Sequence, residues 1–393
     1  MNVLFLLPAL VRGGSETKTV TLANLWAAKR EPPAIAYLLE RPAPLRAEID
    51  PRVPMLCLRR KGKFSLGALL RLRALIERER VPLVLCMNLY PVLYASAVRL
   101  LLGRDAFKLI VAVNITEFAR IRDRLFMALY RPLLRLADAI VFGCELQREL
   151  WQRRYRLAAV PAWVIYNGVD VRHFAPGCTD ENLRERLGLG ARFIVGVVAR
   201  LDAAKNQRGL LRAAAMLAAQ NVDVHVLLAG DGPDRAHLER LAAKLGIEDR
   251  VTLLGEVRDP RPVLAALDVF VLPSVSVETF SNSALQAMAM SVPVVLSRVG
   301  GAEEMVANGE SGLLYAADDL TALARLLRQL HDDAPLRKRL GAQGRDRVLE
   351  KFSIERMAAA YRTLLETSTA EAPVRYPSDR VDITDSSRKF TTR

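Results

Sequence analysis

The chain has 393 residues, of which 51% are hydrophobic and 25% are charged. These proportions are typical of folded globular proteins and exclude a mostly disordered chain, and the length predicts two or three domains of roughly 150 residues each. Four cysteines lie far apart without a C-x-x-C pair. Neither a zinc site nor a disulfide scaffold fits that spacing, whereas a reducing compartment does, so we expect a cytoplasmic protein.

The net charge of +14 lies wholly in the first half of the chain. Residues 1–175 hold 28 Lys or Arg against 14 Asp or Glu, whereas residues 176–393 hold 29 of each. A basic half joined to a neutral half indicates an anionic partner for one domain only. The competing interpretation, of equal weight, is that arginine is used freely on solvated faces and has no partner there.

Two apolar stretches in the first hundred residues raise the question of a membrane. The run Val3–Leu7 has no basic segment before it, which predicts a buried first strand and not a signal peptide. The uncharged stretch Val81–Val98 reaches the lower length limit of a membrane-spanning helix. Because it contains Pro82 and Pro91, we interpret it as a strand at Leu83–Met87, then a loop and a helix.

Short apolar runs alternate with amphipathic stretches along the whole chain. Continuously apolar runs are what strands covered on both faces require, and alternation with helices indicates parallel sheets with right-handed crossovers. We therefore predict an α/β protein of two doubly wound, Rossmann-like domains, with about six strands on each side of residue 166. The main runs are Val3–Leu7, Leu83–Met87, Leu109–Val113, Ala139–Phe142, Ala162–Ile165, Phe193–Val198, Val224–Leu228, Val251–Leu254, Val269–Leu272 and Pro293–Leu296.

The domain boundary is expected at the turn Asn167-Gly168, because an Asn-Gly pair after a strand is a turn signal. Residues 1–166 then form an N-terminal domain and residues 167–366 a C-terminal domain, whose last helices we expect to pack back on the first. The polar segment 367–393 is expected to be a disordered tail.

The densest group of polar residues follows the run Val269–Leu272. Glu278 lies in the loop after that strand, a helix is expected to begin near Ser281, and Gln286 lies about one turn into it. Ligands of doubly wound sheets bind at the carboxyl ends of strands, and a helix N-terminus placed there attracts an anion. Alternatively, Ser281 or Asn282 is only a helix cap and Gln286 only a surface residue.

A second candidate is a pair of cations, Arg200 and Lys205, in the loop after the first strand of the second half. Their spacing suits a diphosphate, although two solvated surface charges would look the same. Gly13 and Gly14 follow the first strand of the chain, where glycine lets a backbone approach a ligand closely. Gly230-Asp231-Gly232-Pro233 is better explained as a tight turn than as a binding loop.

Several motifs are missing from the sequence. It contains no Walker A segment, no G-x-G-x-x-G fingerprint, no Asp-x-Asp pair and no H-E-x-x-H. A P-loop nucleotidase and a carboxylate-held metal site are therefore not indicated.

Together these elements resemble the retaining nucleotide-sugar glycosyltransferases of the GT-B fold, family 4, also called group 1. The resemblance extends over about Asn2–Glu366, and the order and spacing of its motifs make it specific. The similar segments are the glycine-rich first loop Gly13–Glu16, the interdomain turn Asn167–Asp170, the basic pair Arg200 and Lys205, Leu228–Pro233, and an E-x7-E signature beginning at Glu278.

The resemblance implies a metal-independent hexosyltransferase that needs no cofactor and takes a nucleotide-diphosphate sugar as donor. Arg200 and Lys205 would neutralise the departing diphosphate, and Glu278 would bind hydroxyls of the transferred sugar. Gly13 and Gly14 would let the N-terminal domain close onto the diphosphate, which excludes water. Backbone N–H groups would hold the same phosphates at Phe280, Ser281, Asn282 and Ser283.

Two positions depart from the family pattern. The second glutamate of the signature is Gln286 here, which keeps one acceptor oxygen for the ribose hydroxyls but loses the charge. Where many relatives carry a histidine near the donor sugar, this chain has Asn114, and Asn88 stands at a second such place. Asn114 can donate a hydrogen bond but cannot act as a general base, so we expect the donor phosphate to take the acceptor proton.

In this fold the N-terminal domain supplies the acceptor site, and that domain carries the excess charge. We expect a saccharide acceptor, lipid-linked and used in cell-surface polysaccharide or lipopolysaccharide synthesis. We also expect peripheral contact with the anionic inner face of the plasma membrane through Arg59-Arg60-Lys61 with Lys63, or through the basic amphipathic stretch Phe118–Leu136. The competing interpretation of that stretch is a core-packing helix with a solvated arginine face.

Three other functions remain open at this point. A nucleotide-sugar hydrolase or epimerase of the same fold would use the same loops, although the E-x7-E spacing favours transfer. An inactive scaffold is compatible with Gln286. Nucleic-acid binding is disfavoured, because only 6% of residues are aromatic and no recognition motif accompanies the charge.

Overall fold

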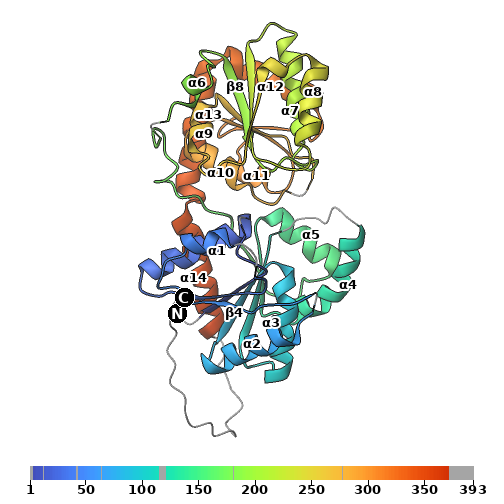
Figure 1. The fold of residues 1–393 in the computed structure, drawn as a ribbon, viewed down its shortest axis with the longest axis vertical. Helices are drawn as coiled ribbons and strands as arrows, with labels where there is room; N and C mark the ends of the chain where they lie inside the picture. Colours follow the sequence, from blue (N-terminus) through green and yellow to red (C-terminus); the bar gives the residue numbers. More distant parts are fainter. Residues whose placement is uncertain are drawn as a thin grey trace.

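The computed structural model describes residues 3–370 apart from 12, 41–42, 63, 115–120, 180 and 277, and the side chains of 121–126 and 370 are also outside the description. Two α/β domains are stacked one above the other, each built on a parallel sheet with helices on both faces (Figure 1). The α/β fold class predicted from the apolar runs is confirmed.

The N-terminal sheet has seven parallel strands in the order β3-β2-β1-β4-β5-β6-β7, one more than expected. The strand order reverses between β1 and β4, and helix α1 begins at the carboxyl end of β1. Short strands β2 and β3 were not among the apolar runs. The strands are β1 (Val3–Leu7), β2 (Ala34–Tyr37), β3 (Met55–Cys57), β4 (Leu83–Met87), β5 (Lys108–Val113), β6 (Ala139–Phe142) and β7 (Ala162–Val164).

The C-terminal sheet has six parallel strands in the order β10-β9-β8-β11-β12-β13. Its strand order reverses between β8 and β11, which are direct neighbours although two strands separate them in the sequence. The loops after these two strands carry the residues predicted to act in catalysis. The strands are β8 (Phe193–Val198), β9 (Val224–Ala229), β10 (Val251–Gly255), β11 (Val269–Leu272), β12 (Val294–Ser297) and β13 (Leu313–Tyr315).

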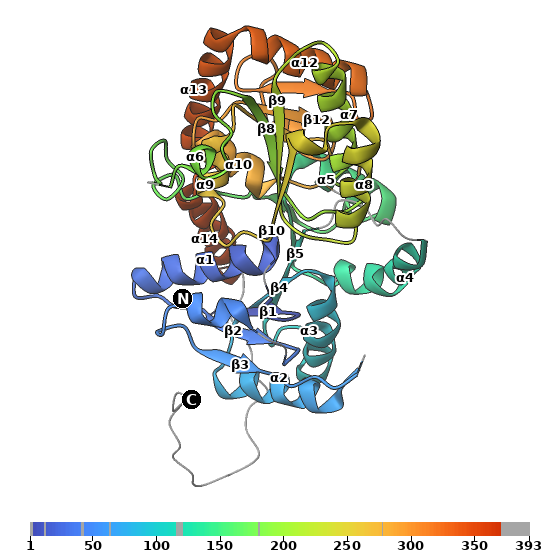
Figure 2. The same ribbon diagram turned by 45° about the horizontal axis from the view of Figure 1, so that its top comes forward.

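Helices cover both faces of each sheet, as Figure 2 shows from a second side. The N-terminal domain has α1 (Gly14–Ala28), α2 (Leu66–Arg78), α3 (Leu89–Leu102), α4 (Ile121–Arg135) and α5 (Glu145–Tyr155). The C-terminal part of the chain has α6 (Leu183–Arg186), α7 (Gln207–Ala218), α8 (Arg235–Leu245), α9 (Arg261–Ala266), α10 (Asn282–Ala289), α11 (Ala302–Met305), α12 (Leu320–Asp332), α13 (Ala334–Lys351) and α14 (Ile354–Ala370).

The last helix belongs to the C-terminal part of the sequence but to the N-terminal domain in space. From α13 the chain descends into α14, which lies along the N-terminal sheet (Figures 1 and 2). Its Met357, Tyr361 and Leu364 are buried in the same cluster as the first strand. The polar tail therefore begins later than predicted: residues 367–370 continue this helix, and only 371–393 fall outside the described residues.

The two domains contact each other closely around the loop that follows β6. A Cβ atom on Gly143 would lie 2.8 Å from the Thr279 side chain, and one on Gly301 would lie 2.9 Å from the Cβ of Cys144. The C-terminal domain also caps a helix of the N-terminal one, because the carboxylate of Glu304 accepts bonds from the N–H groups of Glu145 and Leu146 at 2.8 and 3.0 Å. These contacts join the two domains on the side where loops follow the carboxyl ends of the strands.

The stretch Val81–Val98 folds as predicted into β4, a turn and the first part of α3. Across the helices that the structure describes, we find none with the length and apolarity needed to cross a membrane.

Candidate functional site

The predicted cations Arg200 and Lys205 lie in the loop between β8 and α7. The backbone N–H of Lys205 bonds to Asp202 at 3.1 Å, which closes a turn between the two cations. The loop after β9 packs directly against this turn, because a Cβ on Gly230 would lie 2.0 Å from the carbonyl oxygen of Ala199. The segment 230–233 therefore serves as packing for the cationic loop, which agrees with its interpretation as a turn.

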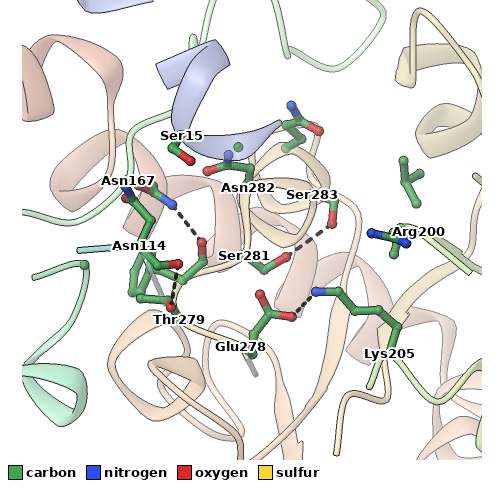
Figure 3. A pocket seen from close by; sticks show the side chains of 16 residues that line it. Ser15, Asn114, Asn167, Arg200, Lys205, Glu278, Thr279, Ser281, Asn282 and Ser283 are labelled. Atoms are coloured by element: carbon green, nitrogen blue, oxygen red, sulfur yellow. Dashed lines mark hydrogen bonds and ion pairs between the residues drawn. The ribbon is translucent and has the colours of Figure 1, made fainter. Parts of the chain in front are cut away.

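Glu278 reaches the same place from the loop after β11. Its carboxylate accepts a bond of 2.5 Å from the Lys205 ammonium (Figure 3) and one of 3.1 Å from the Ser274 hydroxyl. The Lys205 and Glu278 side chains are 24% and 13% exposed. A pair this well covered is costly to break on one side only, because the remaining charge would lie buried without a partner.

Arg200 is held much more loosely than Lys205. Its side chain is 72% exposed, and its ion pair with Asp202 spans 3.9 Å. Arg200 and Ser283 both line the cavity, and no dashed line joins the Arg200 guanidinium to another residue drawn in Figure 3. A guanidinium in this position can turn toward an anionic ligand with little loss of existing interactions.

Helix α10 points its N-terminus into the cavity. The Ser281 hydroxyl accepts a bond of 3.2 Å from the N–H of Ala284, so Ser281 is the N-cap, and it also lies 3.2 Å from the Ser283 hydroxyl. Phe280 turns its ring away into a cluster with Tyr166 and Phe352, at centroid distances of 4.9 and 5.1 Å. The loop thus offers backbone groups and hydroxyls, together with the positive end of a helix dipole, to whatever fills the cavity.

The N-terminal domain contributes the opposite wall. Asn114 stands at the end of β5, where its amide oxygen accepts a 2.7 Å bond from Lys18 and its NH₂ group donates to Asn88 at 3.1 Å. Asn167, in the interdomain turn, donates to the carbonyl oxygen of Phe280 at 2.8 Å. The two walls are therefore joined by hydrogen bonds at the back of the cavity.

Between these walls lies a cavity of about 410 Å³. A smaller cavity of about 270 Å³ adjoins it and shares Asn167, Asn282 and Gln286 with it. The larger volume lies in the range of small-molecule sites. Of the residues predicted from sequence, it gathers Gly14, Asn114, Arg200, Lys205, Glu278, Phe280, Ser281, Asn282, Ser283 and Gln286.

Gly13 is the predicted residue that does not line the cavity. A Cβ there would lie 2.5 Å from the carboxylate of Glu16, and one on Gly14 would lie 3.6 Å from the Asn282 amide nitrogen, an ordinary contact. Gly13 therefore makes room for Glu16, and the space around Gly14 does not by itself demand glycine.

Sequence reasoning missed Lys18, Ser15 and Thr279 at this site. Ser15 and Thr279 line the large cavity and Lys18 lines the small one. Lys18 lies four residues into α1, a helix with no clear polar face, so no sequence pattern marks its side chain as buried. Among the residues that the structure describes, no group of three or more His, Cys, Asp and Glu side chains is placed to hold a metal ion.

Comparison with known families and relatives gives a consistent result. The family model described as "Glycosyl transferases group 1" matches residues 179–347, and that described as "Glycosyltransferase Family 4" matches residues 12–173. The chain is 39% identical over 142 residues to the lipopolysaccharide core biosynthesis glycosyltransferase LpsE of Rhizobium meliloti. The matched segment covers 36% of this chain and 42% of LpsE. The match thus spans less than half the length of that relative.

A longer match is found with the lipopolysaccharide core biosynthesis mannosyltransferase LpsB of the same organism, at 34% identity over 264 residues, covering 61% of this chain and 75% of LpsB. In structure, the chain is similar to Anabaena HepE crystallised in complex with UDP, with a TM-score of 0.82 and 21% identity over 93% of this chain and 100% of HepE. At that identity the similarity shows the fold, and it confirms the predicted arrangement of two facing Rossmann-like domains.

Replacing Ser281 by alanine tests whether the cap of α10 supports the cavity. Ser281→Ala removes the N-cap hydroxyl and should lower the free energy of unfolding by about 1 kcal/mol. It should also weaken UDP or GDP binding several-fold, because the helix N-terminus at the cavity loses its anchor. Ser65→Ala removes the equivalent cap of the distant helix α2. It should cost similar stability in denaturant titration and leave nucleotide affinity unchanged; equal nucleotide affinity in both variants would contradict the role of α10.

Proposed function

Because the chain belongs to the group 1, family 4 glycosyltransferases, we propose that it transfers a sugar from a nucleotide-diphosphate donor to a saccharide acceptor. The observation that carries this proposal is the arrangement of Arg200, Lys205 and Glu278 around the N-terminus of α10. The two cations and the helix N-terminus suit the diphosphate. The Glu278 carboxylate, 2.5 Å from the Lys205 ammonium, suits the hydroxyls of the sugar.

In the proposed reaction the negative charge that develops on the departing diphosphate is stabilised by this chain's own groups. Arg200 is free to turn onto the phosphates, and Lys205 can share its ammonium between them and Glu278, only 2.5 Å away. These two cations can stabilise the charge that a metal ion stabilises in other transferases, so the reaction is proposed to need no metal and no cofactor.

The anomeric configuration is proposed to be retained, as the family resemblance implies. Asn114, which lies where a base could act, has an amide side chain that cannot accept a proton at neutral pH. The acceptor oxygen then bonds to the anomeric carbon as the bond to the diphosphate breaks, and the acceptor proton passes to the released phosphate oxygen. The domains already touch at Gly143 and Gly301, and further closure over the bound substrates is proposed to exclude water from this step.

For the acceptor we propose a lipid-linked saccharide of the kind used in lipopolysaccharide core synthesis. LpsE and LpsB are both described as lipopolysaccharide core enzymes. Of the predicted basic patch, Lys63 lies outside the described residues and Arg60 packs over Tyr90. We propose a membrane contact at the rest of it, the α2-start surface, defined as Arg59, Lys61, Phe64, Leu66 and Leu70. The three apolar side chains are 72%, 70% and 50% exposed, which is unusual for residues of this size. Exposed apolar groups beside basic ones suit the interface of an anionic membrane.

The second membrane candidate, Phe118–Leu136, is less favoured. Phe118 lies outside the described residues, as do the side chains of the first turns of α4. The last turns of α4 bury Met127, Tyr130 and Leu134 in the N-terminal core. For that part of the segment, the core-packing interpretation holds.

A thermal-shift screen tests the donor. UDP or GDP at 100 times its dissociation constant should stabilise the wild-type protein by about 2.7 kcal/mol and raise its melting temperature. Arg200→Ala should weaken nucleotide binding at least tenfold and abolish most turnover, because a cation facing the diphosphate is lost. The matched control is Arg240→Ala, an exposed arginine on α8. No shift with any nucleoside diphosphate, or equal shifts in both variants, would overturn the proposal.

Gln286 allows a separate test of the ribose contact. Gln286→Glu should leave nucleotide affinity intact or improve it, because the carboxylate is the stronger acceptor for hydroxyl groups. Gln286→Leu should weaken binding by about 1–2 kcal/mol, because the acceptor is removed. Isothermal titration with the nucleoside diphosphate measures both. A large loss of affinity in the glutamate variant would argue against a ribose at this position.

Vesicle flotation tests the α2-start surface. The protein should float with vesicles containing phosphatidylglycerol, less at high salt, and not with neutral phosphatidylcholine vesicles. Leu66→Ser with Leu70→Ser should reduce flotation severalfold, because apolar area available for insertion is lost. Leu349→Ser, at an exposed leucine of the C-terminal domain, should not. Flotation that is absent, or unaffected by the double substitution, would remove this surface from the proposal.

A further inference from the structure

Lys18 is a buried ammonium group at the back of the site, and among the residues that the structure describes no carboxylate contacts it. It is 8% exposed, and its Nζ donates to the amide oxygens of Asn114 and Asn167 at 2.7 and 3.3 Å. The ring of Tyr361, on α14, covers it at 5.9 Å. A buried cation held by neutral amides is costly, so its retention calls for a reason beyond packing.

The ammonium dictates the direction of a chain of hydrogen bonds, because it can only donate. Asn114 must turn its oxygen toward Lys18, and its NH₂ group then donates to the oxygen of Asn88 at 3.1 Å. Asn88 donates in turn to the Ser15 hydroxyl at 2.9 Å, and Ser15 donates to the Glu16 carboxylate at 3.2 Å. The chain runs from a cation to an anion with every link in the same direction, an arrangement in which the bonds strengthen one another.

A second branch of hydrogen bonds leads from Lys18 to the segment between β11 and α10, which carries Glu278 and Phe280 and is called the donor loop below. Asn167 also turns its oxygen to Lys18, which leaves its NH₂ group to bond the carbonyl oxygen of Phe280 at 2.8 Å. Phe280 lies between Glu278 and the cap of α10. One ammonium group therefore orients an amide in the N-terminal wall and an amide in the interdomain turn that binds the opposite wall.

We propose that Lys18 is a positioning residue that fixes the amides of Asn114 and Asn167, so that Asn114 offers the cavity an N–H donor and selects an acceptor oxygen, such as a hydroxyl, on the transferred sugar. This inference rests on the proposed function, because it assigns the sugar to the cavity that Asn114 lines. Of the two hydrogens on the Asn114 nitrogen, one bonds Asn88, and among the described residues the second has no protein acceptor, so we assign it to the ligand. An unprotonated Lys18 amine could also accept a hydrogen bond, so it would no longer force Asn114 and Asn167 to turn their amide oxygens toward it.

The charge state of Lys18 gives the inference a signature in pH. Burial lowers the pKa of its ammonium to about 8, partly offset by Glu16, which raises it. Other groups near it are Tyr361, whose pKa burial raises, and Asp170 and His173, which line the small cavity. Donor-sugar affinity should therefore decline as pH rises through about 8.

Stability should change in the opposite direction over the same range. An unfolded lysine titrates near pH 10.4, so between about pH 8 and 10 the unfolded chain binds the extra proton and the folded chain does not. The contribution of Lys18 to the free energy of unfolding therefore rises with pH in this window. A lysine with a purely structural role would show the same rise in stability, but donor-sugar affinity would then not decline near pH 8.

The experiment compares Lys18→Met with Lys29→Met, an exposed lysine at the end of the same helix. For Lys18→Met we expect a 10- to 100-fold loss in kcat/KM for the nucleotide sugar at pH 7, a much smaller loss in affinity for the nucleoside diphosphate alone, and no decline near pH 8. Lys18→Arg, whose charge persists at all accessible pH values, should recover activity and also lack that decline. Lys29→Met should behave as wild type.

The outcomes separate the two proposals. If wild type binds no nucleoside diphosphate, the proposed function fails, and stability then tests the inference. The buried ammonium is overturned if the difference in unfolding free energy between wild type and Lys18→Met stays constant from pH 7 to 10. If wild type binds nucleotide and Lys18→Met keeps the wild-type kcat/KM and pH profile, the inference alone is overturned. Should Lys18→Met fail to fold, Lys18→Arg decides the question. If the decline of donor-sugar affinity near pH 8 persists in Lys18→Arg as in wild type, the inference is overturned.

Discussion

The candidate site depends on one backbone pairing, that of β8 with β11. These strands pair at Val195 with Val269 and at Gly196 with Phe270, although β9 and β10 lie between them in the sequence. Connections that leave two such neighbours in opposite directions open a gap at their carboxyl ends. The loop after β8 brings Arg200 and Lys205 to this gap, and the loop after β11 brings Glu278. Gly196 is required for the arrangement, because a Cβ there would lie 2.6 Å from the carbonyl oxygen of Leu227 on β9.

The cations around the cavity differ in how strongly they are already bound. Lys205 is paired with Glu278 in a covered position, and Lys18 is enclosed by amide oxygens, whereas Arg200 has one long ion pair near the solvent. An arriving anion therefore meets Arg200 first, with little competing interaction to displace. Lys205 and Lys18 instead fix the positions of oxygen atoms on the two walls. The division of roles follows the burial of the three cations, since the exposed one is Arg200 and the covered ones are Lys205 and Lys18.

The sequence allowed the sheets and the loops of the site to be predicted, because buried parallel strands are continuously apolar and ligand loops follow them at the strand-order reversal. The edge strand β3, its neighbour β2 and the edge strand β13 of the other sheet are short, and they were not among the predicted apolar runs. The pairing of Lys205 with Glu278 joins residues 73 positions apart, and the contact of Lys18 with Asn167 joins residues 149 apart. No periodicity encodes such contacts. The late end of α14 was missed because Thr367, Ser368 and Thr369 continue the helix as polar residues after the buried Leu364 and Leu365.

Closure of the cleft is tied to the integrity of helices on both sides of it. The start of α5, in the N-terminal domain, has no side-chain cap of its own, and Glu304 of the C-terminal domain supplies that function while also accepting a 2.9 Å bond from Tyr166. Separating the domains would leave the first N–H groups of α5 to water and would detach Asn167 from the donor loop. Losing a cap costs about 1 kcal/mol, small enough for the cleft to open and large enough to favour the closed form when a ligand adds to it. The bond between Asn167 and Phe280 lines the cavity and also joins the domains, so a ligand that fills the cavity should favour the form in which the domains touch.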